Sequence, residues 1–143
     1  MKEYQSLSHT RWDCKYHVVF IPKRRKKRIF GVLRRHLGEI FRELAKHKES
    51  EVVEGRLMPD HVHMCLSIPP KYAVSNVVGY MKGKSAIMIA RKFGGRERNF
   101  TGEVFWARGY FVSTVGLDEE MVRAYIRNQE QVDEHYDQMK LRL

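Results

Sequence analysis

The residues with the clearest chemical potential are two histidines near the middle of the chain, His61 and His63. They lie in an apolar segment bounded by Pro59 and the pair Pro69-Pro70, a pattern that predicts a β-strand. Successive side chains of a strand point to opposite faces, so both imidazoles project from one face, roughly 6–7 Å apart. Such a pair supplies two ligands for a metal ion and needs a third. It can also line a solvent-exposed face without any function.

A helix predicted over about residues 118–138 offers the missing ligand. Tyr125 and Gln129 are four residues apart, which places them on one face of that helix. Tyr125 alone would be interpreted as a core residue of an amphipathic helix. However, the amides of Asn128 and Gln129 interrupt the apolar stripe, and the helix follows a complete sheet. If it packs over the face that bears the histidines, the carbonyl oxygen of Gln129 completes a three-ligand site.

This arrangement predicts phosphodiester chemistry. Two imidazoles and an amide oxygen leave coordination positions open, which fits Mg²⁺ or Mn²⁺ with phosphate oxygens as further ligands. A phenol has an ordinary pKa near 10, so Tyr125 needs activation, and a neighbouring cation can provide it. Tyr125 would then attack a phosphodiester, form a 5′-phosphotyrosine and release a 3′-hydroxyl. The bond energy is retained, so rejoining needs no ATP.

The charge of the chain indicates a polyanionic partner. Its 143 residues include 27 Lys and Arg against 17 Asp and Glu, giving a net charge of +10 and a pI of about 9.8. Nucleic acid is the first candidate and an anionic membrane surface the second. The candidate DNA-binding residues are six consecutive cations, two lysines of a predicted helix and one arginine: Lys23, Arg24, Arg25, Lys26, Lys27, Arg28, Lys82, Lys84 and Arg108.

Each of these basic features also has a structural explanation. The run of six cations can be a phosphate-contact strip or only a solvated loop. Trp106, Arg108 and Tyr110 are predicted to share one face of a strand, where aromatic residues can stack on unpaired bases or belong to the core.

Hydrophobic spacing predicts the elements that position these residues. Strands are expected over residues 15–21, 51–57 and 103–115 and at the histidines, and helices over residues 30–48, 74–93 and 118–138. The order of elements predicts an α+β protein with a ferredoxin-like βαββαβ sheet, both helices on one face, and an additional C-terminal helix that carries the nucleophile. We expect one domain over residues 1–143.

The composition excludes several protein classes. The N-terminal residues lack the apolar segment of a signal peptide, and no apolar run approaches the roughly 18 residues of a membrane span. Cys14 and Cys65 are too few for a disulfide framework, which favours a reducing cytoplasm. We therefore expect a cytoplasmic protein with no membrane partner.

The motifs together resemble those of a known enzyme family. His61-Val62-His63 is similar to the His-hydrophobe-His signature of the HUH nucleases. A single tyrosine on a C-terminal helix, followed by Gln four residues later, resembles the single-tyrosine HUH transposases of small bacterial insertion sequences (TnpA-like). The similarity covers roughly residues 8–132 and includes, in order, residues 59–63, 79–85, 105–110 and 125–129.

The resemblance implies specific roles. Tyr125 would be the nucleophile, and His61, His63 and Gln129 would be the metal ligands. Members of the family are homodimers that cut and rejoin single-stranded DNA at hairpins near transposon ends. In them the tyrosine helix can serve the histidines of the partner subunit, and Gly116 would suit the role of a hinge.

Two alternatives stay open at this point. The chain can be a non-catalytic or domesticated protein that binds DNA or RNA hairpins on the same fold, although no strand carries the aromatic signature of an RNA-recognition motif. Cys65 lies on the same strand face as the histidines, so a His-His-Cys zinc site is conceivable, but nothing else resembles a zinc motif.

Overall fold

A computed structural model of the 143-residue chain describes residues 5–7, 9–23, 29, 31–93, 105–114, 120 and 123–131. The elements are β1 (Gln5–Leu7), β2 (Thr10–Trp12), β3 (Lys15–Phe20), α1 (Gly31–His47), β4 (Glu51–Met58), β5 (His61–Ser67), α2 (Val74–Phe93) and β6 (Phe111–Ser113). Residues 123–131 are also helical, and we call them the C-terminal helical segment. The predicted remainder of that helix, and residues 24–28 of the basic run, lie outside the described residues. None of the described helices is long and apolar enough to span a membrane.

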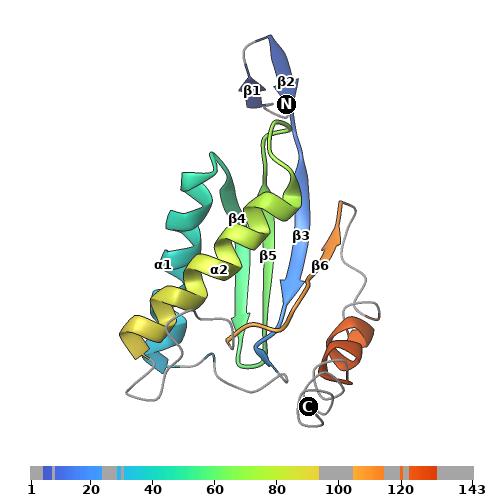
Figure 1. The fold of residues 1–143 in the computed structure, drawn as a ribbon. Coiled ribbons are helices and arrows are strands. Elements are labelled where there is room, and N and C mark those ends of the chain that lie inside the picture. Colours follow the sequence, from blue (N-terminus) through green and yellow to red (C-terminus); the bar gives the residue numbers. More distant parts are fainter. Residues whose placement is uncertain are drawn as a thin grey trace, which may run out of the picture.

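Four strands form an antiparallel sheet in the order β4-β5-β3-β6. After β3, the chain passes through α1 to β4, and β5 then inserts between β4 and β3 and pairs with both. This is the split arrangement of a ferredoxin-like fold, so the predicted α+β class and βαββαβ order are confirmed. Helices α1 and α2 lie side by side over one face of the sheet, and the β1-β2 hairpin extends beyond its end (Figure 1).

The main core lies between the sheet and these two helices. Alternation along β3 directs Val18 and Phe20 into this layer, where both are fully buried. The ring of Phe20 packs edge-on against those of Phe41, at 5.8 Å between centroids, and Trp106, at 4.8 Å. Strand β5 contributes the apolar residues that alternate with its histidines, and so the core fixes which face the histidines occupy.

A smaller cluster lies on the opposite face of the sheet. Val19, Ile21, Ala107 and Ile126 are buried against one another there. Ile126 belongs to the C-terminal helical segment, drawn in red-orange near β6 in Figure 1. The face that the first two helices leave open is therefore the one on which this segment packs.

The last strand differs from the prediction. Pro22 pairs with Trp106 while Val19 pairs with Phe111, so the ladder contains two more residues between 106 and 111 than between 19 and 22. The chain accommodates them in a bulge, where Gly109 adopts a φ of +78°. Trp106 and Arg108 therefore do not share a strand face: Trp106 is buried in the main core, whereas Arg108 is exposed.

Candidate active site

Strand β5 presents the two predicted ligand histidines on the sheet face opposite α1 and α2. His61 and His63 are both partly buried and alternate with the buried side chains of Val62 and Met64. Nδ1 of His61 lies 2.9 Å from a carboxylate oxygen of Asp60. A carboxylate accepts, so Nδ1 carries the proton, and the lone pair of Nε2 is available to a cation. Asp60 thus fixes the tautomer that a metal ligand needs.

A third imidazole lies beside His63. The rings of His17 and His63 are 5.7 Å apart between centroids and inclined by 51°. His17 comes from β3, where its cross-strand partner is Cys65, and Val19 is the partner of His63. Cross-strand partners share a face, so all four side chains lie on the histidine face. Nδ1 of His17 is buried and has no hydrogen-bond partner in the described part of the chain.

The C-terminal helical segment brings Tyr125 to this same face. Ile126 packs on Val19 of β3 and on Ile21, which follows that strand, and the ring of Tyr125 lies 6.2 Å from that of Phe111 on β6. The hydroxyl oxygen of Tyr125 is buried, and a Cβ added at Gly109 would lie 4.0 Å from it. The segment therefore rests on the strand next to β5, within a single chain.

Gln129 is the second polar residue that this segment contributes. Its side chain is 8% exposed, and its amide nitrogen Nε2 donates to the backbone carbonyl of Arg108. This hydrogen bond fixes the orientation of the carboxamide. Oε1 is therefore the atom that Gln129 can offer to a cation, as the predicted ligand role requires.

Comparison with known proteins decides the family. Residues 10–129 match the family described as "Transposase IS200 like". The chain belongs to the IS200-like transposases. Members are HUH tyrosine transposases, so the enzyme class expected from the sequence is confirmed, together with DNA binding and transposition.

Individual IS200-like relatives agree with this assignment. The chain is 42% identical over 141 residues to the transposase of insertion sequence element IS200 from Salmonella typhimurium, covering 99% of this chain and 93% of the relative. It is 29% identical over 119 residues to the ISDra2 transposase TnpA of Deinococcus radiodurans, covering 82% and 85% of the two chains.

Solved structures show the same fold. A crystal structure of a protein from Deinococcus radiodurans assigned as a transposase superposes with a TM-score of 0.73 at 26% identity, covering 90% of this chain and 98% of that one. A REP-associated tyrosine transposase bound to a REP hairpin gives a TM-score of 0.54 at 12% identity, covering 88% and 68%. The second likeness concerns the fold alone.

The four predicted catalytic and metal-binding residues thus lie on the same side of the sheet, His61 and His63 on β5 and Tyr125 and Gln129 on the C-terminal helical segment that packs on β3 and β6. Among the described residues, no three His, Cys, Asp or Glu side chains form a group that could hold a metal ion. A His-His-Cys zinc site is therefore not formed there. In addition, burial raises the pKa of the Cys65 thiol, which disfavours the thiolate that zinc requires.

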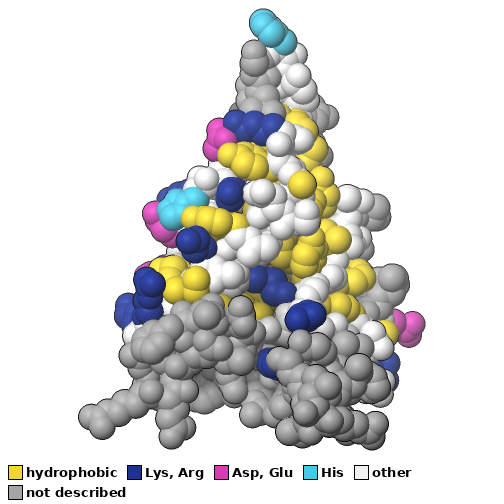
Figure 2. Space-filling model, in the orientation of Figure 1, with side chains coloured by type: hydrophobic (Ala, Val, Ile, Leu, Met, Phe, Trp, Pro, Cys, Tyr) yellow, Lys and Arg dark blue, Asp and Glu magenta, His cyan; other side chains and the backbone are white. Residues whose placement is uncertain are grey.

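The predicted DNA-binding residues lie at separate places in the transposase. Lys84 is exposed on α2, with its Nζ 6.0 Å from the centroid of the Tyr80 ring. Arg108 is exposed on the bulge. Lys82 donates from Nζ to the carbonyls of Ala107, at 2.8 Å, and Gly109, at 2.5 Å. Figure 2 shows the side of the molecule covered by α1 and α2, where the visible Lys and Arg side chains are distributed rather than gathered in one patch.

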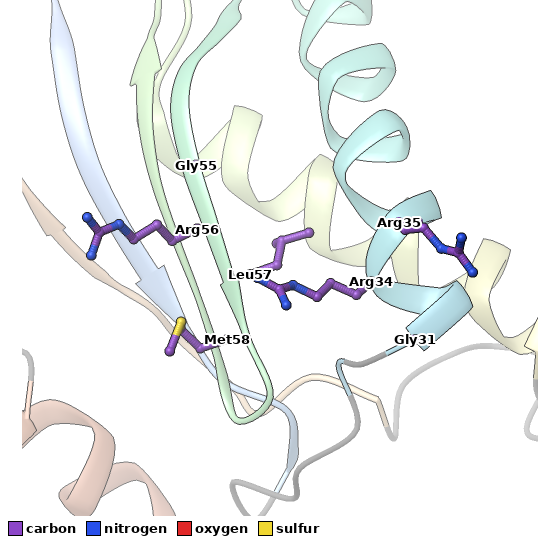
Figure 3. A pocket seen from close by; sticks show the side chains of 7 residues that line it. All are labelled: Gly31, Arg34, Arg35, Gly55, Arg56, Leu57 and Met58. Carbon is purple, nitrogen blue, oxygen red and sulfur yellow. The ribbon is translucent and has the colours of Figure 1, made fainter.

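Sequence reasoning missed a basic residue on the histidine face. Arg56 of β4 is the cross-strand partner of His63, and Met58 is that of His61. Both belong to a groove of about 890 Å³ around β4, lined by Gly31, Arg34, Arg35, Gly55, Arg56, Leu57 and Met58. Figure 3 shows Arg56 and Met58 on the opposite side of β4 from Arg34. Only the pairing registers of β4 and β3 with β5 show that Arg56 and His17 lie on the histidine face.

Proposed function

We propose that this transposase is a metal-dependent single-stranded DNA endonuclease and strand transferase that acts at hairpin-bearing transposon ends through a 5′-phosphotyrosine on Tyr125. One observation carries the proposal: the helical segment with Tyr125 and Gln129 packs on the sheet face that bears His61 and His63. Membership of the HUH tyrosine transposases supports the same reaction class.

In the proposed step, the phenolic oxygen of Tyr125 attacks the phosphorus of a phosphodiester. A new O–P bond forms while the bond to the 3′-oxygen breaks. The phenol gives up its proton, and the departing 3′-oxygen takes one up. The reverse attack by a 3′-hydroxyl restores a phosphodiester and the free phenol, so the protein needs no external energy source to join strands.

The histidine face is suited to hold the divalent ion that this family generally uses. The Asp60 carboxylate fixes the tautomer of His61, and the Arg108 carbonyl fixes the amide of Gln129, so that Nε2 and Oε1 are the donor atoms. His61, His63 and Gln129 would hold Mg²⁺ or Mn²⁺, a choice that mixed nitrogen and oxygen ligands allow. When bound, the ion polarises the P–O bond and stabilises the phenolate.

The burial of the Tyr125 hydroxyl adds a conformational step. Because this oxygen lies against Gly109 and is covered in the structure, the C-terminal helical segment has to shift on the sheet before the phenol meets a phosphodiester. The small cluster of Val19, Ile21, Ala107 and Ile126 is the contact that such a shift must loosen.

The remaining parts of the proposal concern the partners. A homodimer binds single-stranded DNA with hairpin ends, and the net charge of +10 supports the contacts with phosphates. Among the basic residues, those proposed to contact DNA are the run Lys23–Arg28, Lys84 and Arg108. The name of the IS200 relative supports action at insertion-sequence ends.

The test is a covalent adduct. Incubation of the protein with a hairpin-bearing single strand and Mg²⁺ should give a protein–DNA adduct that survives SDS. Tyr125→Phe should form none, while the matched variant Tyr110→Phe, which changes a partly buried tyrosine of the bulge, should still form it. An adduct with Tyr125→Phe would show that another residue is the nucleophile.

The histidines are tested by separating binding from cleavage. His61→Ala should abolish the adduct but retain DNA binding in a gel shift at fixed salt, because the phosphate contacts lie elsewhere. An equal loss of binding would mean that the histidine is structural. If the unaltered protein binds hairpins tightly without metal and never cleaves them, it is a non-catalytic binding protein.

Subunit exchange is tested by mixing. Tyr125→Phe and His61→Ala chains are each expected to be inactive, and a mixed dimer regains one complete site only if the tyrosine helix serves the partner's histidines. The packing of Ile126 on β3 of its own chain leads us to expect no recovery.

A further inference from the structure

The bulge at residues 108–110 is held from both sides of the sheet. The carbonyls of Ala107 and Gly109 accept hydrogen bonds from Nζ of Lys82 on α2. The carbonyl between them, that of Arg108, accepts from Gln129 of the C-terminal helical segment. The bulge thus connects a helix on one face with the tyrosine-bearing segment on the other.

Helix α2 makes a second hydrogen bond to this region, at Trp106 just before the bulge. Ser85 lies almost one turn after Lys82, and its hydroxyl accepts a hydrogen bond of 3.0 Å from the indole nitrogen of Trp106. Both side chains are buried, with Ser85 fully so. Nζ of Lys82 also lies 5.6 Å from the centroid of the Phe20 ring, next to the main core. The amino group therefore comes from a rigid element and is directed at the bulge.

The glycine of the bulge completes the arrangement. Gly109 has a φ of +78°, a conformation that L side chains rarely adopt. Its α-carbon lies beneath the Tyr125 hydroxyl, since an added Cβ would lie 4.0 Å from that oxygen. The position of the bulge therefore determines where the Arg108 carbonyl meets Gln129 and where Gly109 lies beneath the Tyr125 hydroxyl.

We propose that Lys82 is a positioning residue for strand transfer: by holding the carbonyls of Ala107 and Gly109, it fixes the bulge on which Tyr125 and Gln129 dock. The proposal rests on the function proposed above for Tyr125. It gives Lys82 a role in the rate of the chemical step, in place of the phosphate contact that its charge suggests.

The first test separates rate from affinity. Lys82→Met removes the amino group and keeps the apolar chain, and Lys46→Met removes one charge from an exposed position in the last turn of α1. At saturating hairpin DNA and Mg²⁺, we expect Lys82→Met to form the adduct at least about tenfold more slowly than wild type, because misplacement of a reacting group by about 1 Å can reduce the rate about 100-fold. The slope of its log affinity against log salt should match that of Lys46→Met.

The opposite result would overturn the proposal. If Lys82→Met reacts at the wild-type rate when saturated, while the slope of log affinity against log salt falls by about 0.7–0.9, then Lys82 is a phosphate contact. The salt slope is diagnostic because each lost phosphate contact releases one fewer counterion on binding, whatever happens in the chemical step.

A second variant and a second readout keep the test decisive if Lys82→Met folds poorly. Gly109→Ala strains the bulge without changing charge, so it should show the same rate loss at unchanged salt slope; full activity of this variant refutes the proposal. Amide hydrogen exchange of residues 123–131 should accelerate in both variants and not in Lys46→Met. Hydrogen exchange does not depend on catalysis, so it tests the role of Lys82 separately from the function proposed for Tyr125. Failure of the proposed function would show instead as a wild-type protein that forms no Tyr125-dependent adduct.

Discussion

Replacing Ile126 with Ala should release the C-terminal helical segment from the sheet without unfolding the rest of the protein. Ile126 is 8% exposed and packs in the cluster with Val19, Ile21 and Ala107. The substitution removes three carbon atoms from this contact, at roughly 0.8 kcal/mol for each buried CH₂ group. Allowing for the exposed part of the side chain, the docking free energy should fall by about 2 kcal/mol. The open population of the segment should then rise by about 30-fold.

Amide hydrogen exchange followed by mass spectrometry measures this population directly. In Ile126→Ala, residues 123–131 should exchange about 30-fold faster, whereas peptides from β5 and α2 should be unchanged. The matched control is Ile89→Ala in α2, where the same change affects a side chain that is 4% exposed in the main core. It should lower the melting temperature and accelerate exchange throughout the protein, since core deletions of this size cost about 2–5 kcal/mol.

Two results would contradict the structural argument. If exchange of residues 123–131 is the same in Ile126→Ala and wild type, then Ile126 does not dock this segment on the sheet. If β5 accelerates as much as residues 123–131, then the segment has no separate opening equilibrium, and its small cluster is part of the main core.

Four further predictions concern other contacts. Ser85→Ala leaves the buried indole N–H of Trp106 without its acceptor, so the free energy of unfolding should fall by about 1–3 kcal/mol and the melting temperature by several degrees; an unchanged melting curve contradicts this. Burial raises the pKa of the Cys65 thiol, so its alkylation should be slow at neutral pH and should keep rising with pH beyond the ordinary thiol range near 8.5, whereas a plateau there contradicts this. Neutralising three cations of the run Lys23–Arg28 should reduce the salt slope of single-strand binding by about two, and an unchanged slope would identify the run as a solvated loop. Arg56→Gln should reduce the same slope by about 0.7 if DNA crosses the histidine face beside His63, and no change means that DNA takes another path.

Hydrophobic periodicity predicted the elements that position the site. The helices expected over residues 30–48 and 74–93 correspond to Gly31–His47 and Val74–Phe93, because each buries a regular apolar stripe against the sheet. The shared face of His61 and His63 follows from strand geometry alone. The packing of the tyrosine-bearing segment was also predicted, since the βαββαβ order leaves one face of the sheet open for it.

Other parts of the site depend on pairing, which periodicity does not show. His17 and Arg56 flank His63 only because of the registers of β3 and β4 with β5. Asp60 stands beside His61 in the sequence, and this adjacency was the available signal for its hydrogen bond. The short β1-β2 hairpin has no strong apolar alternation and was not predicted.

The bulge at residues 108–110 is the largest difference from the prediction. Aromatic residues at 106 and 110 fit a continuous strand, and the left-handed conformation of Gly109 has no signal beyond the glycine itself. The charge of Lys82 suggested a DNA contact, and its two carbonyl partners become visible only once the bulge exposes them. Local pattern predicted the strands of the main sheet and the helices, but it did not predict the bulge that interrupts the last strand.

The two sides of the bulge differ in strength, and this difference bears on the proposed reaction. On the α2 side, Lys82, Ser85 and the main core hold the chain through several buried contacts. On the histidine face, the tyrosine-bearing segment is docked by one small apolar cluster and the hydrogen bond of Gln129. The weaker side opens first, because local stability follows the number of buried contacts. The proposed shift of Tyr125 therefore leaves the bulge and the histidines in place. DNA can drive this shift only by binding the open form more tightly than the docked form, which means that its affinity should increase when the docking contact is weakened.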